Sequence, residues 1–363
     1  MLEAMVAELQ GVAPLNIAVV GATGAVGTEL LSILEKRRFP AAEIRLFASQ
    51  RSKGKKLWFA GRETPCRVLD SGCFDGMQIV FFDASDEVSA GWVPAAAAAG
   101  AWVVDNSATF RLREDVPLIV PEVNARVLEK WFAENSADRI VSGPNCSTAQ
   151  LVMALKPISD RWGLRRVVVS TYQSTSGAGK LAMQELVAQT GAHAAGKTIK
   201  PSVFPHQIAY NCIPRIGGLK EGGCTGEEQK MVQESRKLLG LAQLRITATA
   251  VRVPTLRCHG ESVNIECERA FELDDVRRAL GDFPGICLID DLSQDLYPMG
   301  EPGASSAVDG AAGRDRVYVG RVRRDDSTDN GLNLWVVSDN LRKGAALNAV
   351  QIGEIIVQKV LRC

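Results

Sequence analysis

LNIAVVGATGAVG, residues 15–27, is the segment from which the architecture of this chain is best predicted. Residues 15–20 form a short continuous apolar run, typical of a strand buried on both faces of a parallel sheet. A glycine-rich turn follows at residues 21–27, and a helix is predicted over residues 28–38, ending near Pro40. This order binds the pyrophosphate of a dinucleotide at the start of a helix. The G-x-x-G-x-x-G spacing also suits plain tight turns, so the flanking elements favour phosphate binding by Gly21, Thr23, Gly24, Ala25 and Val26.

The cofactor class is indicated by the end of the next predicted strand, residues 43–48. Enzymes that use NAD commonly carry an acidic residue there for the ribose 2′-hydroxyl. This chain has Ser49, Arg51 and Ser52 instead, followed by three lysines. A guanidinium flanked by hydroxyls suits a 2′-phosphate, and the alternative is a solvated basic loop. The sequence favours NADP over NAD.

Two further short strands are predicted at residues 78–82 and 101–104, each followed by a polar loop. In open α/β sheets the loops after the strands line the ligand crevice. Arg111 lies in the loop at residues 105–111 and could clamp an anion with two N–H groups, although a single loop arginine is commonly just solvated.

A candidate nucleophile lies in SGPNCSTAQ, residues 142–150. A strand-like run at residues 139–141 enters a Gly-Pro turn, and a helix is predicted over residues 149–155 with Cys146 at its mouth. Helix amino-termini present unpaired N–H groups and partial positive charge, which favour a thiolate and could receive an oxyanion. The alternative is a small buried apolar cysteine.

The second half of the chain is richer in strands. They are predicted near residues 164–174, 246–254, 263–268, 317–324 and 332–337, with helices near 180–190, 225–239 and 274–280. This pattern predicts an α+β domain with a mixed or antiparallel sheet. A final helix, residues 340–361, is apolar almost all round and is expected to pack back onto the nucleotide domain.

The predicted fold class is therefore α/β, with an amino-terminal Rossmann-type dinucleotide-binding domain and an α+β catalytic and dimerisation domain. The expected boundaries are residues 1–143 plus 341–363 for the NADP-binding domain and residues 144–340 for the other.

Candidate site residues in this second half are fewer. His259 is the best candidate base among the three histidines, although a lone loop histidine is usually only solvated. The glycine-rich loop with Ser176 and Gly177 indicates close approach of backbone to a ligand. Glu228 has capping-box spacing from Thr225 and is expected to be structural. Glu227 and Lys230 lie three apart on a helix, which by default means a surface ion pair.

The composition is that of an ordinary globular protein: 363 residues, 46% apolar, with 42 basic and 42 acidic side chains. The balance of charge gives no case for nucleic acid or membrane as a partner. Nine scattered cysteines without a C-x-x-C pair fit free thiols in a reducing cytoplasm, and neither a disulfide framework nor a metal site is expected. The first 14 residues lack the basic start of a secretory signal.

Six motifs give the chain a recognisable likeness. Over essentially residues 15–363 it resembles the aspartate-β-semialdehyde dehydrogenase family in GATGAVG (21–27), SGPNCST (142–148), TYQSTSGAG (171–179), IAYNCIPRIG (208–217), VRVPTLRCHGES (251–262) and DNLRKGAALNA (339–349). The resemblance implies NADPH-dependent reductive dephosphorylation of L-4-aspartyl phosphate to L-aspartate 4-semialdehyde and phosphate. That reaction is the second step of the aspartate pathway to lysine, threonine, methionine and, in bacteria, diaminopimelate. Homodimers, or tetramers, are typical of the family.

The resemblance also implies a role for each matching residue. Cys146 is the nucleophile, His259 the general acid/base, and Gln173 helps to hold the substrate at the thiol. Substrate contacts are implied for Asn145, for Glu227 with the amino group, for Arg252 with the carboxylate, and for Lys230 and Arg111 with the acyl phosphate. Asn340 lies in the segment that reaches the nicotinamide. This chemistry asks for a histidine with a pKa near neutrality as proton shuttle.

Two departures from the family pattern are visible. Phe82-Asp83-Ala84-Ser85 replaces an FSA-type turn, which leaves the nucleotide contacts there open, and Ser174-Thr175 stands where Ala-Val is expected. One rival is N-acetyl-γ-glutamyl-phosphate reductase, for which a His-Pro-Gly-Cys-Tyr surround of the cysteine would be expected. The other is an inactive NADP-binding paralogue, which would be expected to lack the thiol or the base.

Overall fold

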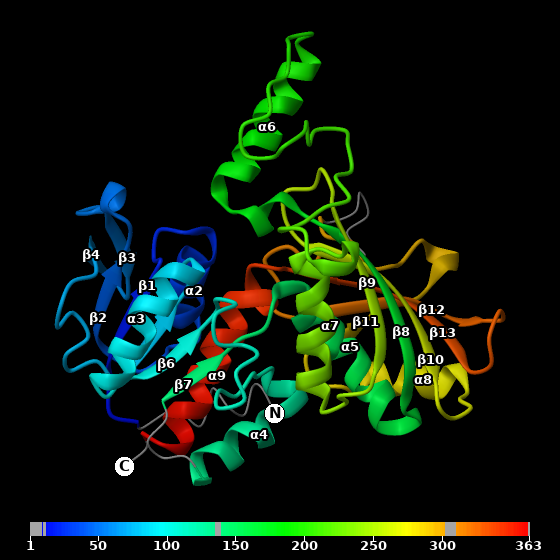
Figure 1. The fold of residues 1–363 in the computed structure, drawn as a ribbon, viewed down its shortest axis with the longest axis horizontal. Helices are drawn as coiled ribbons and strands as arrows, with labels where there is room; N and C mark the ends of the chain where they lie inside the picture. Colours follow the sequence, from blue (N-terminus) through cyan, green and yellow to red (C-terminus); the bar gives the residue numbers. More distant parts are fainter. Residues whose placement is uncertain (1–8, 10–11, 135–138, 302–309, 362–363) are drawn as a thin grey trace. The chain divides into compact units, whose positions relative to one another are not determined.

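The computed structural model describes residue 9 and residues 12–134, 139–301 and 310–361 of the chain. These residues form two compact units (Figure 1). The first unit is drawn from Met1–Asn145 and Ala345–Cys363, and the second from Cys146–Gly344. None of the helices in these ranges is long and apolar enough to cross a membrane.

The first unit contains a seven-stranded sheet in the order β3-β4-β2-β1-β5-β6-β7. Its core strands pair in parallel, and Ile17 in β1 lies opposite Ile44 on one side and Ile79 on the other. The predicted central strands are present, whereas the antiparallel hairpin of β3 and β4 was not predicted. The bounds are β1 Leu15–Val20, β2 Ala41–Phe47, β3 Lys56–Phe59, β4 Arg62–Arg67, β5 Ile79–Phe82, β6 Trp102–Asp105 and β7 Ile140–Ser142.

The described part of this unit also contains the helices α2 (Ala25–Lys36), α3 (Asp86–Ala98), α4 (Pro121–Glu134) and α9 (Leu347–Lys359). The helix expected from residue 28 already begins at Ala25, because Gly24 takes an extended conformation and serves as its N-cap. Thr28 then lies within the first turns of α2.

The carboxy-terminal helix α9 packs in the first unit, as predicted from its apolar surface. Figure 1 shows α9 beside the sheet of that unit, and Val350 and Ile356 are buried in one core with Ile17 and Leu30. A π-helical turn, Arg342–Ala346, leads into it, so the regular helix starts later than residue 340. Glu354 of α9 also receives two hydrogen bonds from Arg37 at the end of α2.

The second unit contains a six-stranded mixed sheet in the order β11-β12-β13-β10-β8-β9. Strands β8 with β9 and β11 with β12 pair in parallel, and the other neighbours are antiparallel, as the strand-rich sequence predicted. The bounds are β8 Leu164–Gln173, β9 Arg245–Arg252, β10 His259–Cys267, β11 Ile286–Leu288, β12 Val317–Asp325 and β13 Gly331–Ser338. The helices are α5 Cys146–Trp162, α6 Lys180–Ala194, α7 Gly226–Leu239 and α8 Leu273–Gly281.

Helices α5, α7 and α8 contact the sheet of the second unit. Helix α7 begins with the predicted capping box, in which Thr225 accepts from the Glu228 N–H and Glu228 accepts from the Thr225 N–H. Glu228 also accepts from the Ala250 N–H in β9, which fixes α7 against the sheet. Its structural role is therefore confirmed.

Candidate active site

Cys146 is the first residue of α5, a helix of 17 residues whose next four side chains are buried. The first N–H groups of a helix have no partner within it and carry the positive end of the helix dipole. The Cys146 thiol is partly exposed and lies at this end. Its position favours the thiolate and offers amides to a developing oxyanion.

His259 lies directly against this thiol, with 3.3 Å between the Cys146 Sγ and the His259 Nε2. The expectation of a loop histidine was wrong: His259 is the first residue of β10 and is fully buried. It pairs with Ser338 of β13 across the sheet, so a rigid strand positions the ring. The local sequence could not predict the burial of His259, because the residues that bury it are distant in the chain.

The tautomer of the ring follows from its other nitrogen. The Ser174 N–H donates to the His259 Nδ1 at 3.1 Å, so Nδ1 carries no proton in the neutral ring and Nε2 does. Burial, with the nearby Arg252 guanidinium second, lowers the pKa of His259 from 6.5 to about 3. The expectation of a pKa near neutrality therefore differs from the low pKa that burial gives this ring. A neutral ring instead points its Nε2–H at the sulfur and stabilises the thiolate.

Gln173 and Arg252 are the last residues of the neighbouring parallel strands β8 and β9, and they are paired with each other across the sheet. Gln173 is buried and donates to the Glu227 carboxylate at 3.2 Å. The Lys230 Nζ lies 3.7 Å from the other oxygen of Glu227, which is itself buried and not a surface residue as the spacing alone implied. The Arg252 Nη1 donates to the Ser174 carbonyl at 2.6 Å. The second unit thus gathers two cations, a carboxylate and an amide around one strand edge.

The glycine-rich loop contains a short 3-10 turn, Thr175–Ala178, that is fixed to the segment before β10. The Thr175 N–H donates to the Thr255 carbonyl at 2.9 Å. A Cβ on Gly177 would lie 2.7 Å from the Arg252 Nη1 and 3.2 Å from the His259 ring, so a larger residue would displace the Arg252 guanidinium or the ring. Close approach of backbone, predicted from the glycines, is present here, and the approach is to the site's own side chains.

Ser176 and Asn340 were expected near the cofactor, and both are buried. The Asn340 Oδ1 accepts from the Cys258 N–H at 3.1 Å, from the Ser176 hydroxyl at 3.0 Å and from the Ser174 hydroxyl at 3.2 Å. This network lies behind His259. Sequence reasoning noted Ser174 as a departure and assigned it no contact with the ring.

Gln150 and Glu261 are two further polar residues beneath the site that sequence reasoning missed. Gln150 donates to the His259 carbonyl at 3.3 Å and accepts from the Ser338 hydroxyl at 2.7 Å. Glu261 is fully buried on β10, two residues after His259 and on the same face of the strand. Burial raises the pKa of Glu261 well above 4.5, which favours the protonated carboxyl. An acidic residue two positions after a candidate base is the sequence signal that could have found Glu261.

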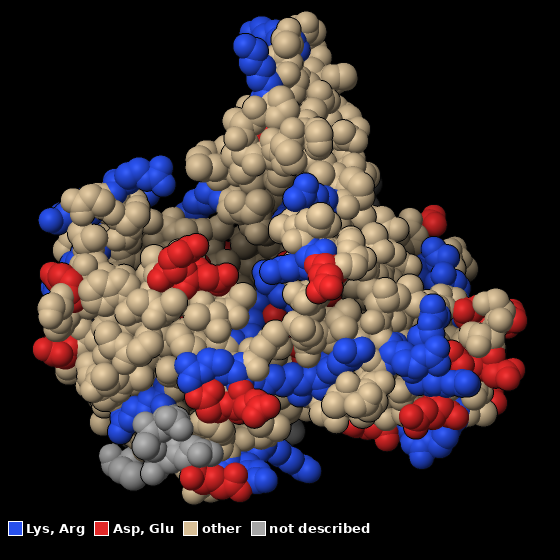
Figure 2. Space-filling view, in the orientation of Figure 1, with Lys and Arg blue, Asp and Glu red and all other residues tan. Residues whose placement is uncertain are grey.

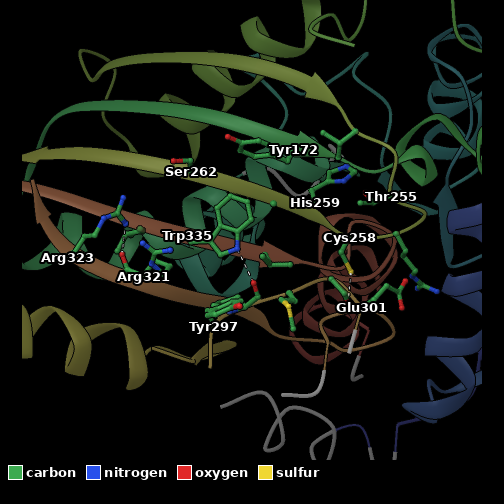
Figure 3. A pocket seen from close by; sticks show the side chains of 18 residues that line it. Tyr172, Thr255, Cys258, His259, Ser262, Tyr297, Glu301, Arg321, Arg323 and Trp335 are labelled. Carbon is green, nitrogen blue, oxygen red and sulfur yellow. Dashed lines mark hydrogen bonds between the residues drawn. The ribbon is translucent and has the colours of Figure 1, made fainter. Parts of the chain in front are cut away.

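A cavity of about 790 Å³ opens on the sheet of the second unit (Figure 3). The Tyr172 and Trp335 rings line it, 5.4 Å apart between centroids, together with Arg321 and Arg323. Among the described residues predicted for the site, His259 is the one that reaches its wall. This cavity is therefore distinct from the edge that carries Gln173 and Glu227.

The nucleotide turn in the first unit has the shape that the glycines predicted. Gly21 has a positive φ of 86°, and a Cβ there would lie 1.9 Å from the Asp83 carbonyl. A Cβ on Gly27 would lie 2.2 Å from the Gly21 carbonyl. The N-cap Gly24 has no side chain to satisfy the first amides of α2, those of Ala25 and Val26. The turn leaves a helix amino-terminus open to a phosphate.

The loop after β2 forms a 3-10 turn, Gln50–Ser52, with Ser49 as its N-cap. The Thr23 hydroxyl lies 3.5 Å from the Ser52 hydroxyl, which links this loop to the glycine turn. Arg51 is exposed. The structure therefore brings the predicted 2′-phosphate residues next to the predicted pyrophosphate turn.

Arg111 and Asn145 also lie in the first unit, and both are buried. The Arg111 Nη2 donates to the Asn106 carbonyl at 2.6 Å, which holds the guanidinium at the end of β6. Asn145 immediately precedes Cys146.

Positive and negative side chains are interspersed on the face that Figure 2 presents, consistent with a net charge of zero.

Comparison with known proteins adds the following. Residues 16–131 match the family described as semialdehyde dehydrogenase, NAD binding domain, and residues 155–343 match semialdehyde dehydrogenase, dimerisation domain. The chain is 44% identical over 348 residues to the aspartate-semialdehyde dehydrogenase of Aquifex aeolicus (strain VF5), covering 95% of this chain and 99% of the relative. It is 43% identical over 348 residues to that of Bacillus subtilis (strain 168), covering 94% and 96%.

Solved structures are similar as well. The aspartate semialdehyde dehydrogenase II of Vibrio cholerae, complexed with ASA, superposes with a TM-score of 0.88 at 41% identity, covering 96% of this chain and 99% of that one. The Candida albicans aspartate semialdehyde dehydrogenase with NADP gives 0.70 at 24% identity, covering 96% and 100%, a likeness of fold alone. The predicted family and fold class are confirmed.

Proposed function

The chain belongs to the aspartate-semialdehyde dehydrogenase family, and we propose that it converts L-4-aspartyl phosphate to L-aspartate 4-semialdehyde and phosphate with NADPH. The observation that carries the proposal is the Cys146 thiol at the start of α5, 3.3 Å from the buried His259 ring. A thiol in this setting is a nucleophile for an acyl carbon.

Cys146 performs the covalent chemistry. Its thiolate attacks the acyl carbon, the C–S bond forms, and the C–O bond to phosphate breaks, leaving a thioester on the sulfur. The amides at the start of α5 stabilise the oxyanion formed on the way. The chemistry supplied by bound NADPH is a hydride, which brings the thioester to the aldehyde level and frees the thiolate again. His259 holds the sulfur through Nε2 and moves a proton at the carbonyl oxygen.

The substrate would be oriented by its charges. The planar guanidinium of Arg252 at the end of β9 would bind the α-carboxylate, and the Glu227 carboxylate would bind the amino group. Gln173 holds Glu227 in place and lies beside Arg252 in the sheet. Lys230 and Arg111 would bind the phosphate, whose charge grows as it leaves. An N-acetylated substrate would present Glu227 with no positive charge, which favours the aspartyl substrate over the rival reductase.

NADP fits the residues of the first unit. The glycine turn is a cradle that a Cβ at Gly21 or Gly27 would fill, and the open amides of α2 would hold the pyrophosphate. Ser49, Arg51 and Ser52 would hold the 2′-phosphate, and no carboxylate stands in that turn to favour NAD.

Ser176, Gly177 and Asn340 of the second unit are proposed for the nicotinamide end. We accordingly assign residues 1–143 and 341–363 to NADP binding and residues 144–340 to catalysis and dimerisation. A cytoplasmic homodimer that serves lysine, threonine, methionine and diaminopimelate synthesis is the setting we propose, supported by the match of residues 155–343 to a dimerisation domain.

The test is phosphate-dependent reduction of NADP by L-aspartate 4-semialdehyde, with NAD in parallel. Cys146→Ala is expected to lower kcat by about a thousandfold or more, since it removes the covalent route. Cys212→Ala, which removes an exposed free thiol, is the matched control and should keep wild-type activity. Arg51→Ala should weaken NADP by about tenfold and leave NAD unchanged.

Turnover that survives Cys146→Ala would contradict the nucleophile. Activity on N-acetylglutamate semialdehyde alone would move the assignment to the rival reductase. Binding of NADP without turnover of either aldehyde would support an inactive paralogue.

A further inference from the structure

Ser174 presents two different groups to one nitrogen of the His259 ring. Its backbone N–H and its hydroxyl both lie 3.1 Å from Nδ1. Ser174 is fully buried and directly follows β8, as the N-cap of the 3-10 turn Thr175–Ala178. The two groups are not equivalent, because an amide N–H only donates whereas a hydroxyl donates and accepts.

The direction of the hydrogen bonds around Ser174 is fixed from the far side. The Cys258 N–H donates to the Asn340 Oδ1, so this oxygen acts as an acceptor. The Ser174 hydroxyl, 3.2 Å from the same oxygen, can direct its proton there, and so can the Ser176 hydroxyl at 3.0 Å. The Ser176 hydroxyl, 2.9 Å away, can donate to one lone pair of the Ser174 Oγ, and the other lone pair can accept from the His259 Nδ1.

The neutral and the doubly protonated ring need opposite partners at Nδ1. The neutral ring with its proton on Nε2 needs a donor, which the Ser174 amide supplies. A second ring proton turns Nδ1 into a donor, and the amide cannot accept from it. We propose that Ser174 is a positioning residue for His259, whose amide holds the neutral ring and whose hydroxyl accepts from the protonated one; this deepens, and rests on, the proposed function.

The hydroxyl matters most when Cys146 and His259 form a thiolate and imidazolium pair. In that step the S–H bond breaks, the sulfur keeps its electron pair, and its proton passes to the Nε2 of a ring that has moved its own proton to Nδ1, so the pair keeps the same number of protons. The Nδ1–H donates to the Ser174 Oγ, and the Ser174 hydroxyl donates to the Asn340 Oδ1. Without the hydroxyl the Nδ1–H loses this acceptor and faces the Ser174 amide donor, so the pair is disfavoured.

Other charges near the ring set the scale of this effect. Arg252 of β9 lowers the pKa of His259, and Glu227 of α7 stands behind that guanidinium. Asp339, beyond β13, is paired with Arg257 at 2.6 Å. Since these surroundings favour the neutral ring, the protonated ring depends on an acceptor at Nδ1.

Alkylation of Cys146 without substrate tests the proposal independently of the proposed function. The rate of reaction with iodoacetamide is followed on the Cys146 peptide by mass spectrometry, at about pH 5.5 and about pH 8.5. Ser174→Ala should slow alkylation about 10- to 100-fold at the lower pH, the loss expected for a hydrogen bond to a charged group, and by less than about threefold at the higher. Thr175→Val is the matched control, because its hydroxyl donates to the Thr255 carbonyl. It should resemble the wild type at both pH values.

Turnover gives a second readout. With L-aspartate 4-semialdehyde, Ser174→Ala should lower kcat by about 10- to 100-fold on the acid side of the pH profile, with KM within about threefold. Nitrogen-15 spectra of the three histidines at neutral pH should show the ring of His259, assigned with His259→Asn, protonated at Nε2 in both proteins.

Equal slowing of alkylation at both pH values would mean a merely structural role and would overturn the proposal, as would wild-type alkylation of Ser174→Ala at pH 5.5. A ring protonated at Nδ1 in the wild type would overturn it too. If the wild type turned over no aldehyde while these alkylation results held, the proposed function would fail and the proposal about Ser174 would stand.

Discussion

Arg37→Met should destabilise the protein in a way that depends on pH, because it removes the partner of a buried carboxylate. The Glu354 carboxylate of α9 is fully buried and receives hydrogen bonds of 2.6 and 2.7 Å from the Arg37 guanidinium. Burial raises the pKa of Glu354 above 4.5 even with Arg37 present. Without Arg37 the protonated, neutral carboxyl is favoured, because a charged carboxylate without a partner is costly in the core.

The cost follows from this protonation. Holding a carboxyl of ordinary pKa 4.5 neutral at pH 7 spans about 2.5 pH units, and each unit is worth about 1.4 kcal/mol, so the loss is at most about 3.4 kcal/mol, less the cost that the raised pKa already imposes on the wild type. Because the folded pKa is raised, the loss grows as pH rises above the unfolded value and shrinks as pH falls towards it. At pH 5.5 about 1.4 kcal/mol remains by the same reasoning.

Urea unfolding at pH 5.5 and pH 7, followed by tryptophan fluorescence, measures both values. Adding Glu354→Gln to Arg37→Met should recover most of the loss at pH 7, because the buried group then has no charge to neutralise. Lys36→Met removes an exposed cation one residue away and should change stability by less than about 0.5 kcal/mol. A loss that is the same at both pH values, or a double variant no more stable than the single one, would refute this reasoning.

Two further predictions concern the two units separately. Burial raises the pKa of Asp83 to about 7, the Gly27 N–H at the start of α2 opposes this by donating to the carboxyl, and the nearby Asp105 carboxylate adds a smaller increase. A phosphate bound there favours the protonated form, so NADPH affinity should fall by up to about tenfold per pH unit above pH 7, and titrations with Asp83→Asn should show no such dependence. In the second unit, a Cβ on Gly344 would lie 2.8 Å from the Cys146 Cβ. Gly344→Ala should therefore displace the thiol and lower kcat by about 10- to 100-fold, and unchanged alkylation rates would count against this.

Sequence reasoning predicted the elements whose residues repeat a simple pattern. The runs around Ile17 and Ile79 are apolar without interruption because both faces of a parallel sheet are covered, and they were found as strands. The hairpin of β3 and β4 was missed because its strands are short, and their residues are mixed in polarity and largely exposed. In such a segment the structure is determined by the pairing of the two strands and not by the burial of side chains.

The site was predictable where residue type and local position decide the chemistry. Cys146 at a helix start and the glycine turn before α2 needed no tertiary information. The burial of His259 and its contact with Ser174 were not predictable, because the two residues are 85 positions apart and meet only through the pairing of β8 with β10. Polar neighbours suggested a loop, whereas packing placed the residue in a sheet.

The return of α9 to the first unit has a consequence for synthesis on the ribosome. The strands of that unit emerge first, yet the helix that completes their core is made last, after the whole segment Cys146–Gly344. At roughly 5–20 residues per second, those about 200 residues take roughly 10–40 s. During this time the apolar face of the sheet in the first unit is not yet covered by α9. The second unit is a continuous segment and can complete its folding first. Nascent chains of this protein should therefore depend on chaperones more through their amino-terminal half than through the half made later.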